Sequence, residues 1–492
     1  MTFSRIKELD PSSASLNSKK RAFARALRLF HEAAERVPAY KDFLKKKKVR
    51  HELVRSEADF VQVPLTDKPN YFSRYSLENL SWNGSLASSK YVSTSSGSTG
   101  VPFFWPRGEE QDVIIGLMTQ HIYEDIFDAK SGTTLFVNSF SLGTWIAGIE
   151  FFNSVRWAAE HGTPITVVTP GIDKEEAVNQ IKKLSPLFSK VVISGYPPFV
   201  KDILDHGIMN GVDWKKMDLK LLFAGEAVSE LWKEKVLALA GRSSNDHART
   251  TNIYGMAEAG VVAHETPVST LLRRNLKNIA KKVTGLPDSD TVTGLYQYYP
   301  LARYFEVVSD DNLVLTANAG LPMIRYNTRD NGGIIEQDAF AGKEGRELSI
   351  LAKRQGINLE KWQLPFVYLH GRKDLSVSLY ALMIYNENIK YALEHSQYTR
   401  QLSGLFTMSV THLENLDQRF EIIVELSKGV APSTTLAEAL ANEIVTKICS
   451  INSEYAKLHS VIGDKAKPHI TLVPQGGIQT IPGKKHKWVK RV

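Results

Sequence analysis

Residues 95–102 form a short stretch in which hydroxyl side chains are interleaved with glycines. Glycine lets the backbone approach a ligand closely, and backbone N–H groups with serine and threonine hydroxyls donate hydrogen bonds to phosphate oxygens. A flexible linker has a similar composition, but this stretch follows a predicted strand at 91–94 and ends in Val-Pro-Phe-Phe-Trp-Pro. No GxxxxGK[ST] sequence occurs, which excludes a Walker loop. We therefore expect phosphate binding by Ser95, Ser96, Gly97, Ser98, Thr99 and Gly100.

The elements that would position this loop are strands that alternate with helices. Short apolar runs predict strands over residues 134–137, 165–168, 190–195 and 221–223. Helical patterns over 148–159 and 174–183 lie between them. This order is typical of an α/β fold with doubly wound, mostly parallel sheets, in which ligands bind beyond the carboxyl ends of the strands.

Different patterns flank this part of the chain. Helices are expected over residues 19–45, broken at Pro38, and over 50–61, ended by Pro64. They make residues 1–90 a helical N-terminal part of a large domain, residues 1–370. A small C-terminal α+β domain, residues 371–492, is predicted from strands at 406–412, 420–426 and 470–473 and a helix at 435–449.

Composition narrows the class of protein. A chain of 492 residues is too long for one core, and its 43% hydrophobic and 23% charged residues are ordinary for globular proteins. The single cysteine, Cys449, excludes an intramolecular disulfide and a multi-cysteine zinc site. We find no signal-peptide pattern and no apolar run near the roughly 20 residues that span a bilayer, so we expect a cytoplasmic protein without a membrane span.

The net charge of +8 is concentrated in two clusters, residues 45–51 and 484–492. The first is a lysine run without interleaved aromatic residues, which is typical of a solvated helix end and a poor surface for reading bases. No nucleic-acid partner is therefore expected. The second cluster contains candidate catalytic lysines.

Six motifs follow one another along nearly the whole chain: the 95–102 stretch, Ala224-Gly225-Glu226, Tyr254-Gly255-Met256-Ala257-Glu258, Arg325-Tyr326-Asn327-Thr328-Arg329-Asp330, Gly371-Arg372-Lys373-Asp374 and Gly483-Lys484. Together they resemble the adenylate-forming superfamily of acyl-CoA synthetases, peptide-synthetase adenylation domains and luciferases. Val37-Pro38-Ala39-Tyr40 and Val63-Pro64-Leu65-Thr66-Asp67-Lys68 are similar to the opening segment of its phenylacetate–CoA ligase-like branch.

The resemblance implies that the large domain, residues 1–370, binds ATP and the acid, that the small domain, residues 371–492, is a mobile lid, and that each matching residue has a role. Glu258 would ligate magnesium, Asp330 would hold the ribose hydroxyls with Arg372 nearby, and Lys484 would be the catalytic lysine of the mobile domain, whose hinge is Asp374. The remaining nucleotide-binding positions are Gly225, Glu226, Tyr254, Gly255 and Met256, and Tyr254 would stack near adenine. Position in the family pattern also suggests an acid pocket near Trp145, Gly195 and Tyr196.

The chemistry suits these residue types. A carboxylate attacks the α-phosphate of ATP, so the site must neutralise two anions while aligning them. A magnesium ion on Glu258 and a lysine ammonium would do so. Two alternatives stay open: Asp330 could cap a turn at residues 331–333, and Lys485 or Lys487 could replace Lys484.

Some positions depart from the family pattern. Ala257 stands at a usual threonine, Arg329 at a usual glycine, Asn386 at a usual proline, and Tyr380-Ala381 at an Arg-Gly pair near the pantetheine tunnel. We predict an AMP-forming carboxylate ligase of the acid–thiol ligase type. It would use ATP and Mg²⁺ to make an acyl-adenylate with release of pyrophosphate, and coenzyme A would be the leading acceptor. An amine, hydroxyl or protein acceptor is the first alternative, and a catalytically weakened nucleotide-binding regulator is the second.

Overall fold

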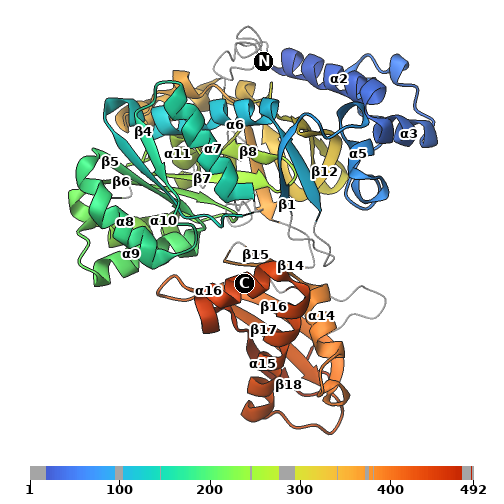
Figure 1. Ribbon diagram of the computed structural model, residues 1–492, viewed down its shortest axis with the longest axis vertical. Helices are drawn as coiled ribbons and strands as arrows, with labels where there is room; N and C mark the ends of the chain where they lie inside the picture. The colour runs from blue at the N-terminus through green and yellow to red at the C-terminus, as the bar shows by residue number, and fades with distance from the viewer. Residues whose placement is uncertain are drawn as a thin grey trace. The chain divides into compact units, whose positions relative to one another are not determined.

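The computed structural model describes residues 18–94, 103–143, 146–243, 246–275, 294–340, 342–371, 376–380, 382–478 and 489 (Figure 1). The chain forms two compact units: the large one holds most of residues 1–372, and the small one consists mainly of residues from 373 onward and also includes Tyr196–Phe199. Among the described residues, no helix has both the length and the apolar character needed to cross a membrane.

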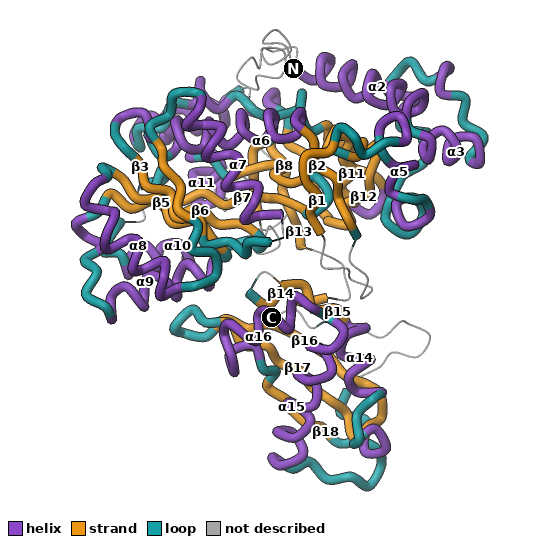
Figure 2. Tube along the Cα trace, in the orientation of Figure 1, coloured by secondary structure: helices purple, strands orange, loops and turns teal. Residues whose placement is uncertain are grey.

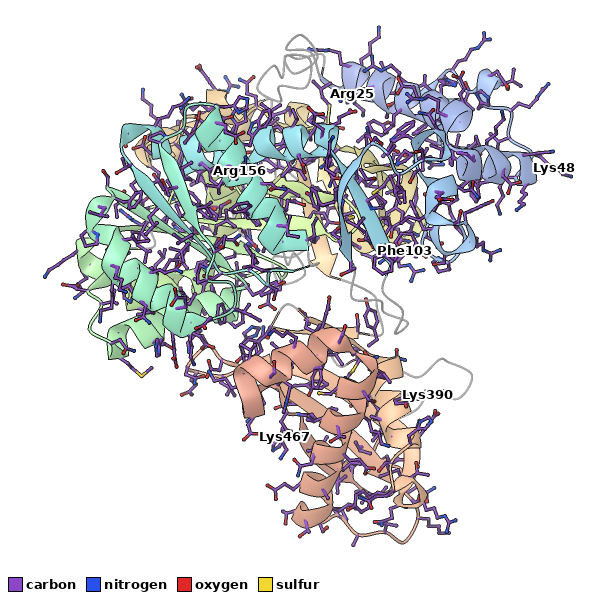
Figure 3. All side chains as sticks on the ribbon, in the orientation of Figure 1. Arg25, Lys48, Phe103, Arg156, Lys390 and Lys467 are labelled. Carbon is purple, nitrogen blue, oxygen red and sulfur yellow. The ribbon has the colours of Figure 1, made fainter. Side chains whose placement is uncertain are left out.

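The large unit begins with helices packed through their apolar faces. Helix α2 (Ser18–Arg36) is followed directly by α3 (Pro38–Lys46), because Pro38 occupies the first position of a new helix after the extended Val37. Phe30, Ala33 and Tyr40 are buried, which confirms the amphipathic prediction. Lys45 to Lys48 are exposed at the end of α3, as expected for a solvated helix end; Lys48 is labelled in Figure 3.

The helix predicted over residues 50–61 is wrong as a single element. The structure has a 3₁₀ turn at His51–Leu53 and a separate helix, α4 (Glu57–Phe60). Ser56 starts α4 because its hydroxyl accepts a hydrogen bond from the backbone N–H of Asp59, while the Asp59 carboxylate accepts one from the Ser56 N–H. The short α5 (Leu77–Leu80) follows.

A sheet of eleven strands forms the centre of the large unit, in the order β10-β11-β12-β13-β9-β8-β7-β6-β5-β3-β4. Its strands are β3 (Thr134–Asn138), β4 (Ile165–Val168), β5 (Lys190–Gly195), β6 (Asp218–Ala224), β7 (Thr250–Met256), β8 (Gly260–His264), β9 (Gly294–Gln297), β10 (Tyr304–Val308), β11 (Asn312–Ala319), β12 (Leu321–Ile335) and β13 (Phe366–Gly371). All four predicted strands are present, and every residue of β3 and β5 is buried. The predicted α/β class is thereby confirmed.

Parallel pairing is confined to one half of this sheet. Strands β4, β3, β5, β6 and β7 pair in parallel, whereas the pairs from β7–β8 through β10–β11 are antiparallel. The sheet is therefore mixed rather than mostly parallel. Its antiparallel half was not predicted, because such strands need no crossover helix and leave no strand–helix alternation in the sequence.

Helices flank the strands of this sheet (Figure 2). They are α6 (Glu109–His121), α7 (Ile146–Glu160), α8 (Lys174–Leu184), α9 (Pro197–Met209), α10 (Glu230–Leu239), α11 (Pro267–Arg274) and α13 (Lys343–Arg354). A separate antiparallel pair, β1 (Ser89–Thr94) and β2 (Phe104–Gly108), brackets the predicted phosphate loop in the sequence.

The small unit has its own hydrophobic core. Strands β16 (Leu402–His412), β17 (Gln418–Leu426) and β18 (His469–Val473) form one sheet, and α15 (Thr434–Ile451) buries Leu440, Ile444 and Ile448. These elements were predicted. A two-stranded sheet of β14 (Ser376–Leu379) and β15 (Leu382–Tyr385), with helices α14 (Asn386–Glu394) and α16 (Ser453–Ile462), was not.

Candidate active site

Glu258 lies in the tight turn between β7 and β8, at the carboxyl end of a central strand. Gly260 adopts a φ of +70°, and a Cβ atom added there would lie 2.3 Å from Oε2 of Glu150. Only glycine fits both the left-handed backbone and this close approach. The turn is thus fixed by its own sequence and by a side chain of α7.

Two side chains from distant segments bind the Glu258 carboxylate. Nζ of Lys68 lies 2.5 Å from Oε1, and the Tyr326 hydroxyl donates a 3.2 Å hydrogen bond to the same oxygen. The Glu258 side chain is 12% exposed and the Lys68 side chain 30%, so the ion pair is partly exposed to solvent. Burial, and then the Glu258 charge, raises the pKa of the Tyr326 phenol well above its usual value, so Tyr326 acts as a donor.

Lys68 reaches this carboxylate because the preceding residues are attached to β12. The backbone N–H of Thr66 donates to the carbonyl of Arg325, and the N–H of Asn327 donates to the carbonyl of Thr66. The ammonium of Lys68 also lies 5.7 Å from the centre of the Trp105 ring, a cation–π distance. The N-terminal helical part therefore contributes a cation to the candidate site.

Asp330 and Tyr254 form a second polar pair, contributed by β12 and β7. The Tyr254 hydroxyl donates a 2.6 Å hydrogen bond to Oδ2 of Asp330, and both side chains are buried. Residues 331–333 continue β12 and pair with β13. The alternative in which Asp330 caps a turn there is wrong, because that segment is strand.

The turn after β6 contains the predicted Gly225 and Glu226. Gly225 has a φ of +97°, and the Glu226 carbonyl accepts a 3.0 Å hydrogen bond from Nδ2 of Asn252 on β7. The Asn252 amide oxygen is buried and has no hydrogen-bond partner among the described residues. The backbone N–H of Asn252 donates a hydrogen bond to the Glu265 carboxylate, which also accepts one from Nζ of Lys233.

The described residues bring together only part of the predicted site. Tyr254, Glu258 and Asp330 come from β7, the β7–β8 turn and β12, with Gly255 and Met256 on β7. Gly195 ends β5, and Tyr196 follows it and is grouped with the small unit. Tyr380 has a φ of +49°, and its N–H donates a 2.5 Å hydrogen bond to Gln418.

Predicted residues outside the described part are Ser95, Ser96, Gly97, Ser98, Thr99, Gly100, Trp145, Arg372, Asp374 and Lys484.

Lys68 and Tyr326 were not assigned a role from the sequence. Both lie inside motifs that carried the resemblance, but neither has a spacing that points to Glu258. The parallel bridge between Thr66 and Tyr326 holds the segment that carries Lys68 beside the strand that carries Tyr326. This contact depends on tertiary pairing, which leaves no local signal in the sequence.

Buried ionisable side chains pack against the β7–β8 turn that carries Glu258. Oε1 of Glu150 accepts a 2.7 Å hydrogen bond from the Val261 N–H. Burial raises the pKa of Glu150 to about 7, although Arg107 and Arg303 favour its charged form. Burial likewise lowers the pKa of Arg303 to about 10. These groups pack beneath the turn that carries Glu258.

The donor groups around Glu258 suit a magnesium ion that is bound partly by the protein and partly by the substrate. No cluster of three or more His, Cys, Asp or Glu side chains occurs in the described part of the chain. Magnesium commonly uses one or two carboxylates together with phosphate oxygens and water. Glu258, a lone carboxylate beside a lysine, fits that pattern and does not fit a cage built from protein ligands alone.

No protein-family model matches this sequence, and no curated protein does. Solved structures do match. The chain is similar to 2-hydroxyisobutyryl-CoA ligase in complex with 2-HIB-AMP and CoA in the thioesterification state, with a TM-score of 0.65 and 15% identity over 97% of this chain and 90% of that one. An open conformation of the same ligase with 2-HIB-AMP and CoA gives a TM-score of 0.54, 15% identity and coverage of 96% and 91%. The postadenylation state of this ligase with R3-HIB-AMP gives a TM-score of 0.54 and 15% identity, with coverage of 97% of this chain and 90% of that one. The chain therefore has the fold of the adenylate-forming acyl-CoA ligases, as its motifs suggested.

Proposed function

We propose that this protein activates a carboxylic acid with ATP, releasing pyrophosphate and forming an acyl-adenylate whose acyl group passes to a second acceptor. The observation that carries the proposal is the arrangement at the β7–β8 turn, in a chain that shares its fold over 97% of its length with a ligase solved with an acyl-AMP and CoA. Lys68 and Tyr326 contact the Glu258 carboxylate, and Asp330 of β12 accepts a hydrogen bond from Tyr254 of β7.

The groups on Glu258 suit the charges of the reaction. Attack of a carboxylate on a phosphate brings two anions together, so positive charge must be in place beforehand. Lys68 supplies one charge, and Glu258 would hold a magnesium ion. When bound, that ion neutralises charge on the phosphate oxygens. As ATP enters, the Lys68 ammonium can pass from Glu258 to a phosphate oxygen, because lysine is a flexible point charge.

Asp330 and Tyr254 would fix the nucleoside. An aspartate accepts hydrogen bonds from two ribose hydroxyls, and charge-assisted bonds of this kind are short and directional. The Tyr254 hydroxyl already donates to Oδ2 of Asp330 and so orients the carboxylate. We further propose that Ser95 to Gly100 bind the phosphates, that Gly225 and Glu226 border the nucleotide, and that the small unit is a lid with Lys484 as its catalytic lysine and Asp374 as its hinge.

The acceptor divides the proposal into two forms. Coenzyme A is the leading one, since the similar ligase was solved with CoA. Tyr380, which has a positive φ and a hydrogen bond to Gln418, stands at the position to which the resemblance assigns an arginine near the pantetheine tunnel. This observation favours the alternative in which an amine, hydroxyl or protein side chain accepts the acyl group.

The test is acid-dependent release of pyrophosphate from ATP over a panel of aryl, fatty and amino acids, with and without coenzyme A. Release with a particular acid supports adenylation. Stimulation by coenzyme A, together with a thioester product, identifies the acceptor; release without a thioester directs the search to amines and proteins. ATP binding without release for any acid would instead support the regulator.

A further inference from the structure

A fully buried arginine on β2 connects three backbone segments around the candidate site. Nε of Arg107 donates a 2.9 Å hydrogen bond to the Ser93 hydroxyl on β1. Nη1 donates to the carbonyls of Glu258, at 2.9 Å, and Ala319, at 3.3 Å, and Nη2 donates to the carbonyl of Ala257. One planar group therefore joins the β1–β2 pair to the β7–β8 turn and to the end of β11.

The segment at Ala319 leads directly into the strand that bears the other site residues. Gly320 has a φ of +87°, and a Cβ atom added there would lie 2.0 Å from the carbonyl oxygen of Pro106. The backbone of β2 thus packs directly on the β11–β12 turn, after which β12 carries Tyr326 and Asp330. Arg107 adds a hydrogen bond at the same point.

The cost of burying this cation indicates that its placement matters. The Arg107 guanidinium is fully buried, so its charge is held against a desolvation penalty. Three backbone carbonyls and a hydroxyl accept from it, and the fixed fork of donors in arginine can reach all of them, whereas a lysine ammonium cannot.

We propose that Arg107 is a positioning residue that fixes the backbone of Glu258 and the start of β12 to the β1–β2 pair, so that Glu258, Tyr326 and Asp330 are held in their relative positions. This inference rests on the proposed function. It assigns Arg107 no contact with substrate: the residue acts through the main chain of Glu258.

Arg303 provides a matched control. It is also fully buried and also binds carbonyls of this turn, those of Ala259 and Val261, together with that of Ala302. The Arg303 hydrogen bonds involve neither the Glu258 carbonyl nor β1. Substitutions R107K and R303K therefore disturb the same turn to a comparable degree, but only R107K breaks the connection to the β1–β2 pair.

We expect R107K to lower kcat for acid-dependent pyrophosphate release by about 100-fold, the scale of a small misplacement of reacting groups, with an unchanged KM for the acid. R303K should lower kcat by less than about tenfold at a similar fall in Tm. Equal losses of kcat at equal Tm shifts would show a structural role only and overturn the proposal. If R107K does not fold, S93A removes a single bond from the guanidinium. It should lower kcat about threefold at a near-native Tm, and an unchanged kcat would contradict the proposal.

Hydrogen exchange distinguishes failure of this inference from failure of the proposed function. If no acid gives pyrophosphate release in the wild type, the proposed function fails, and the exchange rates still decide the coupling. R107K should speed exchange at residues 104–108 and 257–261, whereas R303K should do so only at 257–261. Unchanged exchange at 104–108 in R107K would overturn the proposal.

Discussion

Nζ of Lys68 lies 2.5 Å from Oε1 of Glu258, which joins the N-terminal helical part to the turn after β7. Lys68→Met should lower the rate of adenylation more than tenfold, because one cation facing the phosphates is lost. The Tm should change little, since partly exposed ion pairs contribute about 0–1 kcal/mol. Steady-state pyrophosphate release and a thermal melt measure the two effects. Lys41→Met, at an exposed lysine of α3, is the control; equal activity of the two variants would contradict the role of Lys68.

The hydrogen bond between Tyr254 and Asp330 predicts a coupled effect on nucleotide affinity. D330N should weaken binding of ATP and AMP about tenfold, because a charged acceptor becomes neutral. Y254F keeps the ring and loses the orienting hydrogen bond, so it should weaken nucleotide binding less than D330N does. The effects of the two substitutions on affinity should be non-additive in the double variant. Calorimetric titration gives the affinities, with D311N, at an exposed aspartate, as the control. Unchanged affinity in D330N would exclude Asp330 from the nucleotide site.

Glu150 predicts a pH dependence of stability. Its pKa in the folded protein, about 7, is higher than the usual 4.5, so the folded state binds more protons. The protonated carboxyl makes its whole contribution to the free energy of unfolding below pH 4.5. This contribution, up to about 3 kcal/mol, is lost as the pH rises through 7. The side chain of E150Q stays neutral and can still accept the hydrogen bond from the Val261 N–H. The Tm of E150Q relative to that of the wild type should therefore rise between pH 5 and 8. A Tm difference that does not vary with pH would contradict this.

The buried ion pair between Lys233 and Glu265 predicts a loss of stability. Nζ of Lys233 lies 2.7 Å from Oε2 of Glu265, and both side chains are completely buried. K233M leaves Glu265 with fewer partners in the interior and should destabilise the large unit by about 3–5 kcal/mol. K235M alters an exposed lysine of the same helix and should change the Tm little. Thermal melts of both variants provide the measurement; similar melting temperatures would argue against the pair.

The sequence predicted four of the five strands in the parallel half of the sheet, because each of the four contains a short apolar run. The predicted strands over 165–168 and 190–195 coincide with β4 and β5, and the predicted helix over 435–449 lies within α15. The antiparallel half was missed, since β12 includes Asn327 to Gly333, where polar residues and glycines suggested a turn. Pairing on both sides converts that segment to strand.

The site was predictable only where residues lie close together in the sequence. Tyr254 and Glu258 belong to one motif, and their places on β7 and the following turn follow from it. The contacts of Glu258 with Lys68 and Tyr326, and of its backbone with Arg107, join segments far apart in the chain. Sequence spacing carries no record of such contacts, because tertiary packing alone creates them.

Acid-dependent exchange of labelled pyrophosphate into ATP, measured without any acyl acceptor, tests the central claim most directly. It reports reversible formation of an acyl-adenylate and nothing that follows. With the acid that gives pyrophosphate release, the wild type should show exchange, and E258Q should reduce it by about 100-fold or more while Y326F retains most of it. Pyrophosphate release without exchange, or exchange of equal rate in E258Q, would contradict carboxylate activation at Glu258.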